Sequence, residues 1–368
     1  MPNILTVNAG SSTVRLGVLA STNGVLTKLA ERQLEGAEPG VPHIHSILTE
    51  AGVTGAAVAA HRVVHGGAGF AAPALVTPAV EAAIAAAAAI APLHNPAALA
   101  WLGVARTVLP LSAIHVAVFD TAFFADLPPV ASDYALPRQV VEQHRIRRYG
   151  FHGIAHRAMS QRLAALSPQA ARGRTISLQL GAGCSAAALR NGKPLDTSMG
   201  FSPLEGLVMA TRSGDIDAGL LLHLQREAGL DVDGLDRMLS RESGLLGLSG
   251  TSGDMRTLLE SETAAARHAV DVFVYRARKY VGAYLAVLGG ADAIVFGGGV
   301  GEHAPAIRAR ILDGMAWAGI ELDRDANQAA ASGNLRVSAA ASAVEVWVIP
   351  VDEAEILARE AMAIVAAA

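Results

Sequence analysis

Short apolar runs that end at glycine-rich turns occur in the same order in both halves of the chain. Each half has an apolar run, a turn with glycine and serine, a second apolar run and then an Asn-Gly pair, which is favoured where both residues of a hairpin turn need positive φ. The pattern predicts one strand–turn–strand unit, duplicated. The alternative is two unrelated sheets that match in order, turn type and spacing by coincidence. The copies are residues 4–7, 8–12, 14–19 and Asn23-Gly24, and residues 176–180, 181–185, 186–189 and Asn191-Gly192.

A later apolar strand in each half also ends at polar or glycine-rich residues. Residues 114–119 end at Asp120, residues 293–296 end at the glycine segment 297–302, and we pair these two strands as counterparts. Helical patterns alternate with the strands, which predicts an α/β fold, and ligands of such sheets gather beyond the carboxyl ends of strands. We therefore expect these loops to converge on a cleft between two domains. The helical patterns cover residues 78–91, 97–108, 155–166, 217–228, 264–288, 304–317 and 353–368.

Length and composition limit the kind of protein. With 368 residues the chain fits two domains, which we place at residues 1–150 and 151–353, with the final helix, 354–368, packed back on the first. The hydrophobic fraction of 52% and the mean hydropathy of +0.36 come mainly from small residues. The most apolar helix is interrupted by Glu81 and is shorter than the ~20 residues that span a bilayer. These properties predict a soluble protein.

Charge and cysteine content narrow the partners and the compartment. A net charge of −4 without a basic stripe gives no footprint for nucleic acid, so small molecules are the expected partners. The single cysteine, Cys184, cannot form an internal disulfide, which agrees with a reducing compartment. No basic region precedes the first apolar run, so the N-terminus does not resemble a signal peptide. We expect a cytoplasmic protein.

Three glycine turns follow predicted strands, at residues 10–12, 181–183 and 298–301. Glycine in such a turn lets backbone N–H groups approach phosphate oxygens, because a Cβ would block the approach or forbid the required φ. Three turns together suit a polyphosphate better than one does. None has the Gly-Lys-Ser/Thr ending of a Walker motif, which excludes a P-loop enzyme.

Two arginines lie among apolar residues, Arg62 in AAHRVVHGG and Arg212 in MATRSGD. Arginine is seldom buried without a partner, so we expect both to reach into a cleft, where guanidinium groups hold phosphate or carboxylate bidentately. The alternative is a structural ion pair, such as Asp215 with Arg212.

Two carboxylates and a histidine complete the candidate chemistry. Asp120 and Glu353 follow apolar strands and could hold Mg²⁺ directly or through water, or else could cap helices. His152, between Phe151 and a glycine, could meet a developing charge or could be a satisfied core histidine.

Several segments stand out along the chain, in this order: NAGSST, HRVVHGG, PLHNP, FDTAF, residues 134–156, DTSMGFSPLEGLVMATRSGDID, SGDMR, GGVGE and IPVDE. By these segments the chain resembles the acetate kinase family, including its propionate kinase relatives, almost from end to end. The resemblance implies a duplicated ribonuclease H-like fold of the actin and sugar kinase type, with two domains and an interdomain cleft. It also implies reversible transfer of the terminal phosphate of ATP to acetate, with Mg²⁺, in a homodimer. A carboxylate is already ionised at neutral pH, so direct in-line transfer needs no strong general base.

Carried over by motif, the resemblance implies a role for each matching residue. Its acetate pocket is small and apolar, and such a pocket separates acetate from propionate by only about 1 to 3 kcal/mol per methylene, so both acids stay open. It assigns catalysis to Arg62, Asp120, His152 and Arg212; the acetate pocket to Val64, Leu93, Phe151 and Pro203; nucleotide contacts to Ser12, Arg15, Gly181, Gly183, Asp254, Arg256, Gly298, Gly299, Gly301 and Glu302; and magnesium to Asn8 and Glu353.

The second glycine turn departs from the family, which has His-Leu-Gly-Asn-Gly-Gly where this chain has Gln-Leu-Gly-Ala-Gly-Cys at residues 179–184. The departure keeps open a nucleotide-binding relative with impaired turnover that serves as a sensor or partner. A sugar or polyol kinase of the same fold is a further alternative, with Asp120 as general base toward a hydroxyl. The apolar pocket and the two arginines argue against that second alternative.

Overall fold

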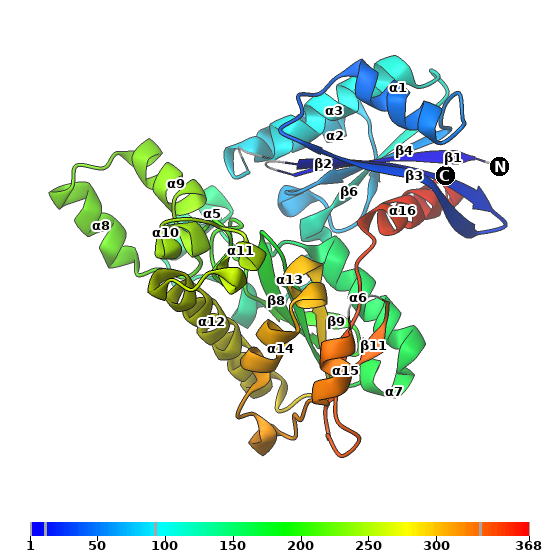
Figure 1. The fold of residues 1–368 in the computed structure, drawn as a ribbon. Coiled ribbons are helices and arrows are strands. Elements are labelled where there is room, and N and C mark those ends of the chain that lie inside the picture. Colours follow the sequence, from blue (N-terminus) through cyan, green and yellow to red (C-terminus); the bar gives the residue numbers. More distant parts are fainter. Residues whose placement is uncertain (1, 11–12, 92–93, 331–332, 368) are drawn as a thin grey trace. The chain divides into compact units, whose positions relative to one another are not determined.

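The computed structural model describes residues 2–10, 13–91, 94–330 and 333–367 (Figure 1). The chain forms two compact units, and each is discontinuous in sequence. Along the sequence, the chain leaves unit 1 after Asp126, returns to it at Phe151 and leaves it again after Ala158. The sequence pattern predicts one division, after residue 150. Unit 1 comprises Met1–Asp126, Phe151–Ala158 and Asp352–Ala368, and unit 2 comprises Leu127–Gly150 and Met159–Val351.

Each unit is built on a six-stranded sheet. The strands of unit 1 are β1 (Asn3–Ala9), β2 (Thr13–Thr22), β3 (Val25–Glu35), β4 (Val58–Val63), β5 (Ala74–Leu75) and β6 (Ile114–Phe119). Those of unit 2 are β7 (Arg174–Leu180), β8 (Cys184–Arg190), β9 (Lys193–Thr197), β10 (Ala293–Gly297), β11 (Leu335–Arg336) and β12 (Glu345–Val348).

The two sheets repeat one topology. Unit 1 has the strand order β3-β2-β1-β4-β6-β5, and unit 2 has the order β9-β8-β7-β10-β12-β11, with the same pattern of parallel and antiparallel neighbours. Both Asn-Gly turns have positive φ at both residues, 51° and 80° in the first unit and 50° and 72° in the second. The duplicated strand–turn–strand unit predicted from the sequence is confirmed.

One pairing predicted from the sequence is wrong. The sequence pattern pairs β6, the strand that leads to Asp120, with β10, but β10 lies beside the first strand of its sheet, as β4 does in unit 1. The counterpart of β6 is β12. An apolar run followed by a polar turn describes many strands equally well, and strand order depends on the crossovers between them. β4, which carries Arg62, is therefore the topological counterpart of β10, the strand that leads into the glycine segment 298–302.

The sheet of unit 1 is buried on both faces, so its inner strands are apolar at successive positions. Ile4 packs on one side with Leu357 and other residues of the C-terminal helix, and Leu5 packs on the opposite side with Trp101. Figure 1 shows this arrangement, with α16 (Glu353–Ala367) on one face and α1 (Val41–Glu50) with α3 (Asn95–Val108) on the other. The C-terminal helix, which begins at Glu353, therefore covers one face of the unit 1 sheet.

Several predicted helices are confirmed, but two are shorter than predicted. The pattern over 304–317 yields a helix that ends at Leu312, because Gly314 adopts a left-handed conformation (φ 74°) and a separate 3₁₀ turn follows. The pattern over 78–91 gives an α-helix only to Ala86, followed by another 3₁₀ turn. Among the described residues, no helix is both long and apolar enough to cross a membrane.

The remaining helices surround the two sheets or form the connections. They are α2 (Pro78–Ala86), α4 (Pro129–Ser132), α5 (Arg138–His144), α6 (Gly153–Leu166), α7 (Pro168–Ala171), α8 (Ala218–Glu227), α9 (Val232–Arg241), α10 (Gly244–Ser249), α11 (Met255–Glu260), α12 (Ala264–Leu288), α13 (Gly298–His303), α14 (Pro305–Leu312) and α15 (Arg324–Ala329), with 3₁₀ turns at Gly67–Gly69, Ala87–Ala89, Asp120–Phe124 and Ala316–Ala318.

Candidate active site

Strand register brings three predicted site residues to one edge of the unit 1 sheet. β1, β4 and β6 run parallel, with Val7 opposite His61 and Val63 opposite Phe119. Asn8, Arg62 and Asp120 are therefore all at the carboxyl ends of neighbouring strands. This is the edge where ligands of α/β sheets gather.

Arg62 is the centre of the resulting polar cluster. Its Nε and Nη2 donate to the same carboxylate oxygen of Asp120, at 3.1 Å and 2.6 Å, and its Nη1 donates to the side-chain oxygen of Asn8 at 2.9 Å. The arginine side chain is 12% exposed and that of Asp120 is 1% exposed. A buried pair with several hydrogen bonds has little freedom to move, so the guanidinium plane is fixed before any substrate arrives.

Burial and charge act in opposite directions on this pair. Burial alone would lower the pKa of Arg62, but the charges of Asp120 and Glu353 raise it above its ordinary value. Burial raises the pKa of Asp120, and the adjacent guanidinium opposes that rise. The arginine stays charged at every physiological pH, which suits a group that holds an anion.

Glu353 joins the cluster from a distant part of the sequence. Asn8 donates from its side-chain nitrogen to the carboxylate of Glu353, 345 residues away, at the first residue of α16. The expected magnesium residues are therefore in contact with each other and, through Asn8, with Arg62. Because α16 packs on the sheet, the position of this carboxylate depends on the C-terminal helix.

His152 is held next to Asp120 by close backbone packing. It has a left-handed backbone conformation (φ 55°), which is uncommon for a residue with a side chain. The following residue must be glycine, since a Cβ at Gly153 would lie 2.0 Å from the carbonyl oxygen of Asp120. The backbone N–H of His152 also interacts with the Asp120 carboxyl group. Unit 1 thus brings Asn8, Arg62, Asp120, His152 and Glu353 into one neighbourhood.

The predicted acetate-pocket residues are divided between the units. Val64 and Phe151, 4% and 1% exposed, are buried in unit 1, where the Phe151 ring meets the His65 ring edge-on with centroids 5.4 Å apart. Pro203 is in unit 2, where its carbonyl oxygen accepts a 2.8 Å hydrogen bond from Arg212. Leu93 lies outside the described residues.

The loop that carries Arg212 is anchored by Asp215. The Asp215 carboxylate accepts the backbone N–H of Gly206 at 2.8 Å and the Tyr280 hydroxyl at 2.9 Å. The ion pair between Asp215 and Arg212 considered from the sequence is therefore not the main bonding of this carboxylate. Asp215 instead ties the loop to α12.

Two glycine segments of unit 2 lie against each other. Gly298 has φ 75°, and a Cβ there would lie 2.6 Å from the carbonyl oxygen of Leu180, at the end of β7. The carboxylate of Glu302 accepts the backbone N–H of Gly298 at 2.9 Å and that of Val351 at 3.3 Å. Gly181 donates its N–H to the Gly183 carbonyl at 3.1 Å, which closes the first segment. Gly299 and Gly301 belong to the second segment, within α13.

The divergent turn at residues 179–184 has an unusual interior. Cys184 is completely buried, and its thiol donates to the carbonyl oxygen of Gly181 at 3.1 Å. Burial raises the pKa of this thiol to about 12. The amide oxygen of Gln179 is buried without a hydrogen-bond partner in the described part of the chain. The hydrogen bond from the thiol to Gly181 therefore stabilises the conformation of the turn.

The other predicted nucleotide residues lie on exposed surfaces. Asp254 caps α11 and pairs with Arg256 at 2.6 Å, with side chains 42% and 86% exposed. Arg15, on β2, is opposite Asn8 in the strand register and donates to Gln33 at 2.9 Å. Ser12 lies outside the described residues.

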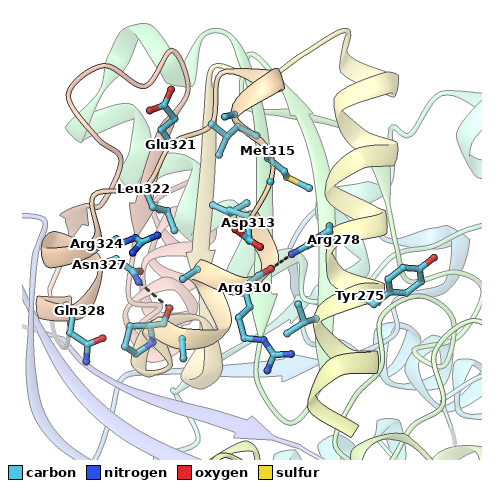
Figure 2. A pocket seen from close by; sticks show the side chains of 18 of the residues that line it. Tyr275, Arg278, Arg310, Asp313, Met315, Glu321, Leu322, Arg324, Asn327 and Gln328 are labelled. Carbon is cyan, nitrogen blue, oxygen red and sulfur yellow. Dashed lines mark hydrogen bonds between the residues drawn. The ribbon is translucent and has the colours of Figure 1, made fainter. Parts of the chain in front are cut away.

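A cavity of about 900 Å³ in unit 2 contains none of the predicted site residues. Figure 2 shows it between α12, α14 and the segment that leads into α15. Arg278 donates from the cavity wall to the backbone carbonyls of Arg310 and Ile311. No sequence signal pointed to this cavity.

Comparison with known proteins decides the family. The family model described as "Acetokinase family" matches residues 36–359. This chain is a member of the acetokinase family. The acetate kinase of Leifsonia xyli is 44% identical, with full coverage of both chains, and that of Clavibacter michiganensis is 50% identical over 82% of this chain and 77% of its own.

Solved structures of acetokinases agree with the fold. A crystal structure of Porphyromonas gingivalis acetate kinase matches with a TM-score of 0.88 and 35% identity, over 99% of this chain and all of the other. A propionate kinase from Francisella tularensis matches with a TM-score of 0.89 and 32% identity, over the same shares of the two chains. The resemblance noted from the sequence and the two-domain α/β fold it implied are confirmed.

Proposed function

We propose that this acetokinase transfers the terminal phosphate of ATP to acetate, giving acetyl phosphate and ADP, and that the reaction is reversible. The observation that carries the proposal is the buried Arg62, held by Asp120 and Asn8 at the strand edge. A fixed and permanently charged guanidinium suits reactants that both carry negative charge. The family membership supports the same reaction.

The chemistry proposed is direct in-line transfer. An acetate carboxylate is ionised at neutral pH and attacks without losing a proton, so no residue has to act as a strong base. Arg62 and Arg212 hold the carboxylate and the transferring phosphate, and His152 stabilises the charge that spreads over the phosphate oxygens. Asp120 fixes the plane of the Arg62 guanidinium through its two hydrogen bonds.

Magnesium fits the oxygen ligands of the cluster. Mg²⁺ prefers oxygen ligands and usually takes one or two protein carboxylates together with substrate phosphates and water. Glu353, Asn8 and Asp120 supply such oxygens within one hydrogen-bonded group. Among the described residues, no cluster of three or more His, Cys, Asp or Glu side chains could hold a metal ion without further ligands. When bound, the ion neutralises phosphate charge.

Nucleotide binding is assigned to unit 2. The segments at Gly181–Gly183 and Gly298–Glu302 follow β7 and β10, and they pack closely enough to exclude a Cβ at Gly298. Backbone N–H groups in such turns bind phosphate oxygens. Asp254 and Arg256 are proposed to contact the nucleotide from the start of α11.

The acid that fits best is acetate, with propionate as the second candidate. Val64 and Phe151 are both buried and apolar, as a pocket wall for a methyl group must be. Propionate stays a candidate because a propionate kinase shares this fold at a TM-score of 0.89. One methylene changes binding by only about 1 to 3 kcal/mol, so the preference is a matter of degree.

A homodimer is proposed on the evidence of α8. This helix has no buried residue although it carries four leucines, and Leu220 and Leu222 are 41% and 51% exposed. Val232, at the start of the next helix, is 72% exposed. Large apolar side chains exposed along a helix that buries no residue are typical of an interaction region, and a second copy of the chain is proposed as the partner. Light scattering should report a dimer for the parent and a monomer for Leu222→Glu; identical masses would refute this surface.

The fully buried single cysteine agrees with a proposed cytoplasmic location.

The reaction is tested with purified protein, MgATP and hydroxylamine, which traps acyl phosphates as hydroxamates. Acetate, propionate and butyrate are compared at equal concentrations. The proposal expects hydroxamate from acetate at the highest kcat/KM. ATP binding without hydroxamate from any acid would instead identify a nucleotide-binding relative that has lost turnover.

A further inference from the structure

Arg308, on α14, is a completely buried arginine that is held entirely by carbonyl oxygens. Its Nε donates to the side-chain oxygen of Asn327 at 2.8 Å, and its Nη2 donates to the backbone oxygens of Asn327 at 2.7 Å and Ala330 at 3.4 Å. Its Nη1 donates to the backbone oxygens of Gly301 and Glu302, both at 2.8 Å. All three nitrogens of the guanidinium are thus used.

Among the residues that the structure describes, no carboxylate pairs with this guanidinium. Its hydrogen bonds within the described chain all go to neutral oxygens. Burial lowers the pKa of Arg308 to about 10, so the group is still positively charged at neutral pH. A buried charge of this kind costs several kcal/mol in desolvation, and a well-packed apolar side chain would often serve stability as well or better. Its presence therefore points to a role beyond packing.

The bonds of Arg308 lead to the glycine segment that follows β10. Gly301 and Glu302 are near the end of α13, and the Glu302 carboxylate accepts the backbone N–H of Gly298 at the start of the same helix. Arg308 therefore fixes the Glu302 backbone, and Glu302 fixes the first glycine. On its other side Arg308 is anchored to α15, and Asn327 donates to the carbonyl of Pro305 at 3.0 Å (Figure 2).

We propose that Arg308 is a positioning residue for nucleotide phosphates. It holds the segment Gly298–Glu302 in its binding conformation and places an uncompensated positive charge behind that segment. A positive charge in a low-dielectric interior attracts an anion at the nearby surface more strongly than the same charge would in water. The inference rests on the proposed nucleotide role of this segment and adds a residue that does not itself touch the nucleotide.

The test compares Arg308→Met with Arg308→Lys and with a matched control, Arg278→Met. Arg278 also donates to backbone carbonyls near a helix end, those of Arg310 and Ile311 on α14, but has no bond to the glycine segment. Calorimetry of MgADP binding, KM for ATP, KM for acetate and thermal unfolding are measured for each variant.

Arg308→Met should weaken MgADP binding and raise KM for ATP at least tenfold, with KM for acetate within twofold of the parent. Arg308→Lys keeps the charge and should recover part of the loss. Arg278→Met should lower the unfolding temperature with both KM values unchanged. If the Arg308 variants fold and bind MgADP within twofold of the parent, the proposal is wrong. A parent that binds no MgADP would instead refute the nucleotide role of unit 2.

Asn327→Asp decides the matter if Arg308→Met does not fold. This change keeps an oxygen at the position that accepts the Nε hydrogen bond and gives the guanidinium a carboxylate partner. The charge behind the glycine segment is then neutralised and the hydrogen bonds of Arg308 are kept, although the bond from residue 327 to the Pro305 carbonyl is lost. MgADP affinity should fall at least threefold, and unchanged affinity would show that the buried charge has no effect on the nucleotide.

Discussion

Arg62, on β4, donates two hydrogen bonds, at 2.6 Å and 3.1 Å, to a single oxygen of Asp120, the residue that directly follows the neighbouring parallel strand β6. The strand register fixes both backbones, so the pair is aligned by the sheet and not by a flexible loop. This arrangement gives the proposed transfer a rigid cation at the strand edge. It also makes the pair important for stability.

Removal of Asp120 should be costly because it leaves a largely buried charge without its partner. Asp120→Ala is expected to lower the free energy of unfolding by about 3 to 5 kcal/mol, the usual loss for one member of a buried ion pair. Arg106→Ala is the control, since its pair with Glu81 is 39% and 30% exposed and should contribute at most about 1 kcal/mol. Urea unfolding measures both. Equal losses would contradict the burial argument.

Gly298 should not tolerate a side chain, whereas its neighbour should. Gly298→Ala forces a left-handed residue and a contact of 2.6 Å with the Leu180 carbonyl, which should cost at least about 1 to 2 kcal/mol. Gly299→Ala meets no atom within 4 Å and should unfold at the temperature of the parent. Thermal unfolding of the two variants checks this. Similar melting temperatures would mean that the segment is not tightly packed on β7.

Stability should fall in mild acid. His156 is buried, and burial lowers its pKa to about 3. His61 and His115, whose rings stack on each other, also have lowered pKa values, mainly because of burial. An unfolded histidine titrates near 6.5, so below that pH the unfolded chain binds more protons than the folded one. The stabilisation is complete above about pH 6.5 and is lost as the pH falls toward about 3, at up to about 1.4 kcal/mol per pH unit for each histidine.

Urea unfolding between pH 7 and pH 5 measures that slope. His156→Gln should make it shallower by one histidine's share, while the exposed His268→Gln should leave it unchanged. A parent whose stability is the same at both pH values would contradict the burial of these rings.

Cys184 should be nearly inert in the folded protein. Its side chain is completely buried and its pKa is raised to about 12 by burial, so almost no reactive thiolate is present at pH 8. Mass spectrometry after exposure to iodoacetamide should find native protein unmodified for hours and urea-unfolded protein alkylated within minutes. Rapid alkylation of the native protein would show that the turn at residues 179–184 opens readily.

The sequence could predict what depends on local pattern. The duplicated turns, the α/β class and the ends of α12 follow from glycine positions and apolar periodicity. Arg62 and Asp120 stand out in the sequence because Arg62 lies within an apolar run and Asp120 follows one, and a charged side chain is conspicuous in both places. Their placement at the ends of parallel strands is what brings them into contact.

Features that depend on long-range packing could not be predicted. The order of β10 and β12 follows from crossovers that leave no local mark, and the Asn8 contact with Glu353 spans 345 residues. Arg308 lies in a helical stretch with other arginines, and nothing in its neighbours indicates that it alone is completely buried. Such facts appear only when the sheets and helices are assembled.

Hydroxamate formation from MgATP and acetate measures whether fixed guanidinium groups drive phosphate transfer to a carboxylate. Arg62→Ala and Arg212→Ala should each lower kcat at least ~100-fold relative to the parent, as loss of one preorganised donor does, while both variants still bind MgADP. Turnover near that of the parent in either folded variant would show that these guanidinium groups do not drive the transfer.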